Sequence, residues 1–239
     1  MDTQFFTETD GEMIRSFRYH PATSIGFKTT KQDVKILDTV LFGKTLFLDG
    51  VLQSSLMDED IYHRKLVHPA LGHAPHAKSV CIVGGGEGAT VREVLKYKHI
   101  ESVTMIDWDR ELVEYFRDKE PSWHKGALLD PRVRLEHLDI FQILDESRKY
   151  DVVIIDLTDP DLEENKWNTF FVKISTWLNP GGVLVANTGG MFPWDSTTTT
   201  KCEELLKRGL GDTPHTMYKY KQFVPSFGRE WTFVHCRLI

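Results

Sequence analysis

The sequence predicts an α/β protein in which a mostly parallel sheet follows a small N-terminal antiparallel β domain. Three observations support this prediction. Strand-like and helix-like segments alternate from residue 78 onward, a glycine-rich run follows an apolar strand at 84–88, and period-two alternation fills roughly the first 55 residues. A glycine turn between a strand and a helix, within such an alternation, is typical of a Rossmann-like fold of the methyltransferase type.

The N-terminal segment shows the alternation of a small antiparallel sheet. Strands are predicted over residues 16–20, 23–28, 33–39 and 40–48, with hairpin turns at 42–45 and 49–50. From Asp58 the apolar spacing changes to that of a helix, which Gly72 ends. We therefore expect an N-terminal β domain over residues 1–74 and a Rossmann-like catalytic domain over residues 75–239.

The second domain is expected to alternate strands and helices. The predicted strands span 79–83, 102–107, 132–137, 151–156 and 182–187, and the predicted helices span 90–97, 109–118, a short stretch near 140–147, 165–178 and about 200–209. Residues 217–224 and 231–238 are predicted to close the sheet as a β-hairpin. A helix between two strands brings the chain back to the end of the sheet at which the first strand began, so the two strands run parallel.

Composition excludes several classes of function. Of the 239 residues 41% are hydrophobic, and the formal net charge is −6 with no long basic run. Such a chain lacks the electrostatic footprint of a nucleic-acid-binding protein and suits a cationic ligand.

No signal peptide and no run of ~18 apolar residues is found. The three cysteines lie far apart, which indicates reduced thiols and a cytoplasmic location. The histidines at 68, 73 and 76 lack metal-site spacing, so no metal is expected.

The glycine-rich run indicates a nucleoside site. Its glycines permit positive φ and close approach of a ligand to the backbone. Asp107 stands about 20 residues further on, at the end of the next strand, where a carboxylate can accept both ribose hydroxyls. Glu87 lies within the loop and would repel a pyrophosphate, so an adenosyl sulfonium compound fits better than a dinucleotide. The alternative is that Glu87 is a solvated loop acid.

A second acidic motif follows the strand at 151–156. The carboxyl end of that buried strand brings Asp156 to the edge of the sheet where open α/β sheets bind ligands, and Asp159 follows on the loop. Two carboxylates facing a sulfonium would attract a polyamine. Alternatively, Asp159 with Pro160 forms a simple turn and Asp156 caps the next helix, although a capping residue normally lies closer to its helix.

Several motifs occur in one order along nearly the whole chain. They are Leu48–Gln53, Asp58-Glu59 with Tyr62-His63, Gly84–Gly88 with Arg92–Leu95, Asp156–Pro160, and Pro225–Phe227. This set resembles the polyamine aminopropyltransferases, the spermidine and spermine synthase family. Within that family, Leu66–Leu71 after Tyr62-His63, the glutamate at 87, and Pro225–Phe227 with Trp231 look most like thermospermine synthases.

The resemblance implies roles for individual residues. Decarboxylated S-adenosylmethionine, a co-substrate and not a prosthetic group, would contact Gln32, Gln53, Gly84, Gly86, Glu87, Asp107, Asp139, Ile140 and Asp156. The implied catalytic residues, which position and deprotonate the attacking amine, are Asp156, Tyr62 and Asp159. The implied amine-binding residues are Tyr62, His63, Asp58, Glu59, Asp159, Phe227 and Trp231.

The resemblance further implies transfer of the aminopropyl group to a polyamine with release of methylthioadenosine. Spermidine is the favoured acceptor, giving thermospermine or spermine, and putrescine is possible. A homodimer joined through the N-terminal β domains is expected, with no nucleic-acid or membrane partner. Two alternatives remain: a non-catalytic polyamine- or nucleoside-binding protein, and an amine N-methyltransferase using S-adenosylmethionine. Glu87 disfavours the methyltransferase because it would repel the carboxylate of intact S-adenosylmethionine.

Two departures from the family pattern concern the amine end of the site. Arg64 stands where an acid usually follows Tyr-His, and residues 161–167 replace a Gly-Pro-containing segment. If Arg64 pointed inward, its charge would reduce affinity for a polycation.

Overall fold

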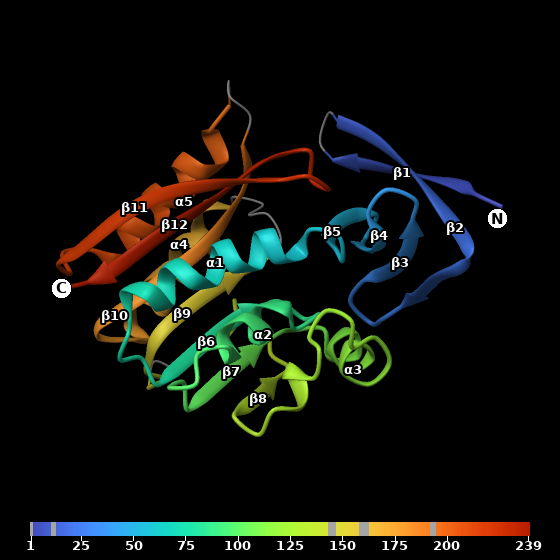
Figure 1. The fold of residues 1–239 in the computed structure, drawn as a ribbon. Helices are drawn as coiled ribbons and strands as arrows, with labels where there is room; N and C mark the ends of the chain where they lie inside the picture. The colour runs from blue at the N-terminus through green and yellow to red at the C-terminus, as the bar shows by residue number, and fades with distance from the viewer. Residues whose placement is uncertain (1, 11–12, 143–146, 158–162, 192–194) are drawn as a thin grey trace.

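The computed structural model describes residues 2–10, 13–142, 147–157, 163–191 and 195–239. Two sheets lie side by side, with the small N-terminal sheet facing the carboxyl ends of the strands of the larger one (Figure 1). This arrangement confirms the predicted fold class.

The small sheet is antiparallel, in the strand order β1-β2-β3-β4-β5. Its strands are β1 (Gln4–Asp10), β2 (Met13–Lys28), β3 (Asp33–Thr39), β4 (Gly43–Leu48) and β5 (Val51–Ser55). The two strands predicted over 16–28 are the single strand β2, whose register shifts between His20 and Ile25 and so accommodates Pro21, which cannot donate to a ladder. Residues 40–42 form a turn and not the start of a strand, so β4 begins at Gly43.

The large sheet has the order β11-β12-β10-β9-β6-β7-β8. Five strands run parallel: β6 (Ser79–Gly84), β7 (Ser102–Ile106), β8 (Val133–Glu136), β9 (Tyr150–Asp156) and β10 (Leu178–Met191). The predicted hairpin is β11 (His215–Val224) with β12 (Arg229–Leu238), and β12 pairs antiparallel with β10.

Helices connect and cover the parallel strands. They are α1 (Glu59–His73), α2 (Ala89–Leu95), α3 (Arg110–Lys119), α4 (Glu164–Thr176) and α5 (Thr197–Leu210), with a short 3-10 turn, η1, at Ala127–Leu129. Of the short helix predicted near 140–147, residues 140–142 form a turn and 143–146 lie outside the described residues. None of the helices in the described ranges has the length and apolar character needed to span a bilayer.

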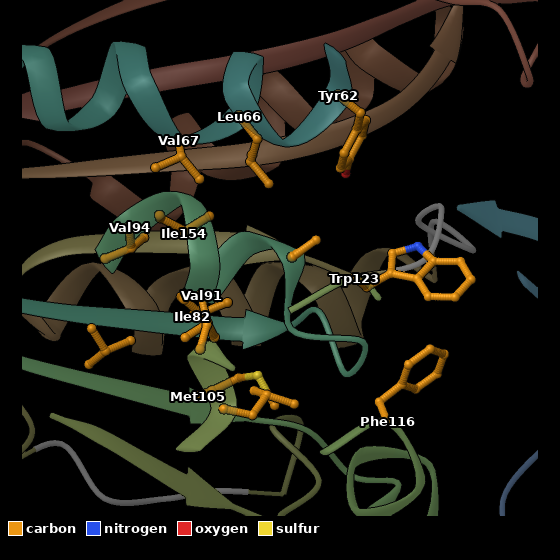
Figure 2. Close-up of a cluster of buried hydrophobic side chains, with 14 of the residues drawn as sticks. Tyr62, Leu66, Val67, Ile82, Val91, Val94, Met105, Phe116, Trp123 and Ile154 are labelled. Carbon is orange, nitrogen blue, oxygen red and sulfur yellow. The ribbon is translucent and has the colours of Figure 1, made fainter. Parts of the chain in front are cut away.

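Side chains of the central strands alternate between two cores. On β6, Val80 and Ile82 join a cluster that includes α1 and α2, whereas Cys81 and Val83 join one that includes α4 and α5. Figure 2 shows α1 and α2 facing each other across this first cluster. Burial on both faces explains why these strands read as continuous apolar runs. Helix α1 lies within the predicted 1–74 unit but packs on the large sheet, and the division at residue 74 stays a prediction.

The turn after β6 depends on glycine. Gly84 has a φ of 85°, and a Cβ added there would lie 2.2 Å from the carbonyl oxygen of Asp156 on β9. We expect Gly84→Ala to lower the free energy of unfolding by about 3 kcal/mol or more, because backbone strain and a clash add together. Gly181, with a φ of 74° and open space around it, is the matched control, and its change to Ala should cost about 1 kcal/mol. Urea unfolding of both variants measures the difference, and equal losses would contradict the expectation.

Candidate active site

A cavity of about 650 Å³ is lined by residues from the carboxyl ends of the parallel strands and from the small sheet. Most of the residues that the sequence singled out line it. They are Gln32, Gln53, Tyr62, His63, Gly84, Gly86, Glu87, Asp107, Asp139, Ile140, Asp156, Phe227 and Trp231. Open α/β sheets bind their ligands at this edge.

Two of the candidate residues do not line the cavity. Asp58 is buried, and its carboxylate accepts hydrogen bonds from the backbone N–H of Ser226 at 2.6 Å and from the Ser226 hydroxyl at 2.9 Å. The carboxylate of Glu59 turns toward Arg92 and His63. Neither acid is placed to receive a distal amine, because each is already held by a partner in the protein. Asp159 lies outside the described residues.

The two departures at the amine end differ in where they lie. Arg64 is exposed and lies 3.9 Å from Asp60 on the outer face of α1, so its charge does not enter the cavity. Of the 161–167 segment, Lys166 and Trp167 line the cavity, and the ammonium of Lys166 lies 4.3 Å from the ring centroid of Phe141. The part of the segment before residue 163 is not described.

Asp107 follows β7 and is buried beside the glycine loop. Its Oδ1 accepts a hydrogen bond from the backbone N–H of Asp109 at 2.9 Å, and a Cβ added to Gly86 would lie 2.9 Å from its Oδ2. The absence of a side chain at 86 therefore lets the loop approach this carboxylate closely. Burial raises the pKa of Asp107 to about 7, and the nearby charges of Asp109 and Glu87 act in the same direction.

The raised pKa of Asp107 gives a testable dependence of stability on pH. Asp107 has a pKa of about 7 in the folded chain, against the ordinary value of 3.8 expected in the unfolded chain. The folded chain therefore binds the proton more tightly, and its free energy of unfolding falls as the pH rises from 3.8 to 7. We expect Asp107→Asn, without ligand, to be more stable than the wild type by about 1–3 kcal/mol at pH 8, with a smaller advantage at pH 5. Urea unfolding at both pH values checks this, and a variant less stable than the wild type at pH 8 would refute it.

Asp156 ends β9 at the floor of the cavity. The hydroxyl of Tyr62 donates to its Oδ1 at 2.8 Å, and the hydroxyl of Thr90 donates to its Oδ2. Burial raises the pKa of Asp156, and the positive charge of His63 opposes that shift. Sequence reasoning missed Thr90, although its place at the start of the helix after the glycine loop was a usable signal. Asp156 is thus an oriented carboxylate with a tendency to bind a proton.

His63 lies between two carboxylates. Its Nδ1 is 2.9 Å from Glu59 Oε2, and its Nε2 is 3.0 Å from Glu87 Oε1. Burial disfavours the charged ring, but hydrogen bonds to Glu59 and Glu87 raise the pKa of His63 to about 10. Burial also disfavours the charged form of Glu59, but the hydrogen bonds from His63 and Arg92 outweigh this effect and lower the pKa of Glu59 to about 2.

His63, Glu87 and Asp156 could also be considered as metal ligands, because their ligand atoms lie within 4.8 Å of one another. The raised pKa of His63, about 10, means that both ring nitrogens carry protons toward carboxylates, and a protonated imidazole has no lone pair to offer a metal. The donor set therefore suits a protonated histidine, and beyond it an ammonium ligand, better than a cation held by the ring.

An aromatic wall closes the other side of the cavity. The rings of Phe227 and Trp231 lie 4.4 Å apart between centroids, and Tyr62 lies 6.1 Å from Phe227. The indole N–H of Trp231 donates to Asn187 Oδ1 at 2.6 Å, which orients the ring. Sequence reasoning missed Asn187, a polar residue at the end of the predicted strand 182–187.

Charged residues that sequence reasoning missed line the cavity beside this wall. Arg229 forms an ion pair with Asp10 of β1, and its guanidinium lies 5.3 Å from the centroid of the Trp231 ring. Arg15 donates to the carbonyl oxygen of Phe227 at 2.6 Å. These contacts join the small sheet to the β11–β12 hairpin, so only the folded chain brings them together.

Comparison with known proteins identifies the family of this chain. The chain matches the spermine/spermidine synthase domain over residues 59–237. It is 38% identical over 215 residues to a polyamine aminopropyltransferase of Pyrobaculum calidifontis, covering 87% of this chain and 73% of that protein. It is 43% identical over 217 residues to a polyamine aminopropyltransferase of Saccharolobus islandicus, covering 87% and 69%.

Solved structures show the same fold. A spermidine synthase in complex with the transition-state analogue AdoDATO superposes with a TM-score of 0.87 at 23% identity, over 98% of this chain and 80% of that one. The spermidine synthase of Thermotoga maritima has a TM-score of 0.82 at 23% identity, over 98% and 79%. With the matched domain and the curated relatives, the chain belongs to the spermine/spermidine synthase family of polyamine aminopropyltransferases.

Proposed function

We propose that this protein transfers the aminopropyl group of decarboxylated S-adenosylmethionine to a polyamine and releases methylthioadenosine. Spermidine is the favoured acceptor, giving thermospermine or spermine, and putrescine is a possible one. The observation that carries the proposal is that Glu87, Asp107 and Asp156 line one cavity together with an aromatic wall. A nucleoside, a sulfonium and an amine chain each find complementary groups there.

The donor would lie across the glycine loop. In this proposal Asp107 accepts the ribose hydroxyls, Asp139 and Ile140 border the adenine, and Gln32 and Gln53 reach in from the small sheet. Glu87 would accept from the aminopropyl ammonium, since one of its oxygens faces His63 and its side chain lines the cavity. These residues reach the cavity from both sheets, which supports a ligand held between them.

The reaction needs a free amine and a good leaving group. A primary amine of pKa ~10.4 is mostly protonated at neutral pH, so exposing its lone pair costs about 4–5 kcal/mol. Asp156, oriented by Tyr62, is the residue we propose to take that proton, and Asp159 is proposed to assist. The nitrogen then attacks the methylene carbon next to sulfur, the C–S bond breaks, and the electron pair leaves with neutral methylthioadenosine. Positioning the two substrates is the remaining requirement.

The acceptor would lie along the aromatic wall. Phe227 and Trp231 are buried and border the cavity, so an alkyl chain longer than that of putrescine can contact apolar rings along its length. This wall supports spermidine as the preferred acceptor. The carboxylate of Asp10 lies at the same border, in an ion pair with Arg229.

The direct test is incubation of the protein with decarboxylated S-adenosylmethionine and either putrescine or spermidine. Chromatography that separates spermine from thermospermine identifies the product, and intact S-adenosylmethionine is the control donor. We expect methylthioadenosine release with the decarboxylated donor and faster turnover of spermidine. Faster turnover of putrescine would overturn the acceptor assignment, and methylated amines from the control donor would indicate a methyltransferase.

The role proposed for Glu87 gives a further prediction. Glu87→Gln should weaken binding of decarboxylated S-adenosylmethionine by roughly 1.5–3 kcal/mol, because it removes a charge-assisted hydrogen bond to the ammonium. Binding of methylthioadenosine, which lacks that ammonium, should change little. Calorimetric titration with both ligands measures the two effects. Equal weakening of the two would show that Glu87 does not contact the ammonium.

We also propose a homodimer joined through the small sheets, in the cytoplasm. Phe5 on β1 and Ile14 on β2 expose 71% and 70% of their surface, and a sheet of this size gains stability when such side chains are covered. Light scattering at micromolar concentration tests the association, and a monomer would overturn it.

A further inference from the structure

A buried chain of ion pairs leads from α2 to the floor of the cavity. Arg92 donates to both carboxylate oxygens of Glu59, each at 2.8 Å. Glu59 faces His63 Nδ1, and His63 Nε2 faces Glu87. The side chains of Glu59 and His63 are each 4% exposed and that of Arg92 is 10% exposed, so water screens these charges little.

We propose that Arg92 and Glu59 are positioning residues which hold His63 as an imidazolium against Glu87, and that this fixed positive charge keeps Asp156 ionised as the proton acceptor. The catalytic part of this inference, the effect on Asp156 as proton acceptor, rests on the proposed aminopropyl transfer. The charge state of His63 itself is a property of the protein without substrates.

The surroundings of His63 favour the charged ring. Carboxylates face it from three elements: Glu59 from its own helix, Glu87 from the loop after β6, and Asp156 from the end of β9. The phenol of Tyr62 packs edge-on, with ring centroids 5.0 Å apart. A neutral imidazole donates from only one nitrogen and would turn a lone pair toward one of the carboxylates, whereas the imidazolium donates to both.

The ring is oriented at Nδ1 by Glu59, whose backbone carbonyl oxygen lies 2.6 Å away and whose carboxylate, held by Arg92, lies 2.9 Å away. The guanidinium holds Glu59 at both oxygens and also donates to the carbonyl oxygen of Trp123, which fixes the arginine in turn. Glu59 and His63 are four residues apart on α1 and therefore share a face of the helix. The imidazole then presents Nε2 to Glu87, which fixes one oxygen of that acid.

The charge of His63 has a consequence for Asp156. Burial and the negative charge of Glu87 both favour the protonated form of Asp156, and the charge of His63 opposes them. A protonated Asp156 cannot accept the proton of the attacking amine. Loss of the imidazolium should therefore move the ionisation of Asp156, and with it the rise of activity with pH, to higher pH.

Nuclear magnetic resonance of protein with isotope-labelled histidine tests the first half without substrates. We expect the His63 signals, assigned from their loss in His63→Gln, to remain those of an imidazolium up to about pH 9. In Glu59→Gln the midpoint should fall by 1–3 pH units, as expected on removal of a charge within about 4–6 Å. Lys96→Met, which removes an exposed partner of Glu93 further along the network, should leave the midpoint unchanged. A neutral His63 at pH 7.5 in the wild type would overturn the inference.

The pH dependence of kcat tests the second half. His63→Gln should move the acidic limb of kcat upward by at least about one pH unit, read from the complete profile of kcat against pH. Reduced activity with an unshifted limb would mean that His63 has only a structural role. If the imidazolium signals are found but no amine is aminopropylated by the wild type, the proposed function fails while the charge state of His63 stands.

Discussion

Asp156→Asn is expected to lower kcat by ~10² to 10⁴, the usual range for loss of a general base. The amide keeps the size of the side chain and can still bond to the hydroxyls of Tyr62 and Thr90, which orient the present carboxylate. It cannot accept the proton of the attacking amine at neutral pH. Binding of methylthioadenosine should stay within a few-fold of the wild type, because Asp107 and the glycine loop are untouched.

Steady-state assays with saturating substrates measure this loss, and calorimetry measures the nucleoside binding. Asp151→Asn is a matched control on the same strand. Asp151 lies at the other end of β9, where it accepts from the backbone N–H groups of Lys78 and Ser79. Asp151→Asn should lower the free energy of unfolding but leave kcat nearly unchanged. If Asp156→Asn kept more than half of the wild-type rate, the proton acceptor would have to be another residue.

Arg92→Met is expected to lower the free energy of unfolding by about 3–5 kcal/mol. Removing one partner of a buried ion pair is strongly destabilising. Here Glu59 would keep only His63 as a charged partner, and Glu93 would keep only Lys96 and His68, which are 52% and 32% exposed. Glu59 and Glu93 both contact Arg92, at 2.8 and 2.9 Å, and their side chains are 4% and 1% exposed. Methionine has a similar length but carries no charge, so the loss reports mainly on the ion pairs.

Urea unfolding, with a check that the slope of the transition is unchanged, measures the effect. Arg64→Met is the control, since Arg64 is 62% exposed and lies 3.9 Å from Asp60. An exposed pair of this kind contributes little, so that change should stay within about 0.5 kcal/mol. Similar losses for the two variants would show that the Arg92 network does not stabilise the fold.

The elements of the fold could be predicted because their signals are local. Alternation of period two in the first strands, helical spacing after Asp58 and apolar runs between glycine turns each report on neighbouring residues alone. Errors occurred where neighbours do not decide the structure. Residues 40–42 have the apolar character of a strand, but the chain turns there to pair β4 with β3. A bulge let β2 continue past Pro21, where the sequence indicated a break.

For the cavity, the sequence determined the residues whose position follows from the topology. Gly84, Asp107 and Asp156 come at or directly after the ends of parallel strands, and those ends meet at one edge of the sheet, so their convergence follows from the order of elements. The aromatic residues at 227 and 231 were placed by resemblance, since the hairpin that carries them can be assigned to the cavity only through long-range pairing with β10.

Only the tertiary structure decided the partners of the acids at the start of α1. Asp58 and Glu59 lie just before Tyr62, and from the sequence either acid could bind an amine. In the structure Asp58 binds Ser226, 168 residues away, and Glu59 binds Arg92. The spacing of four between Glu59 and His63 was the available local signal for their contact. Which acid faces the cavity depends on how α1 packs against α2 and the β11–β12 hairpin. A buried carboxylate is stable only where a partner compensates its charge, so the side chain points toward that partner.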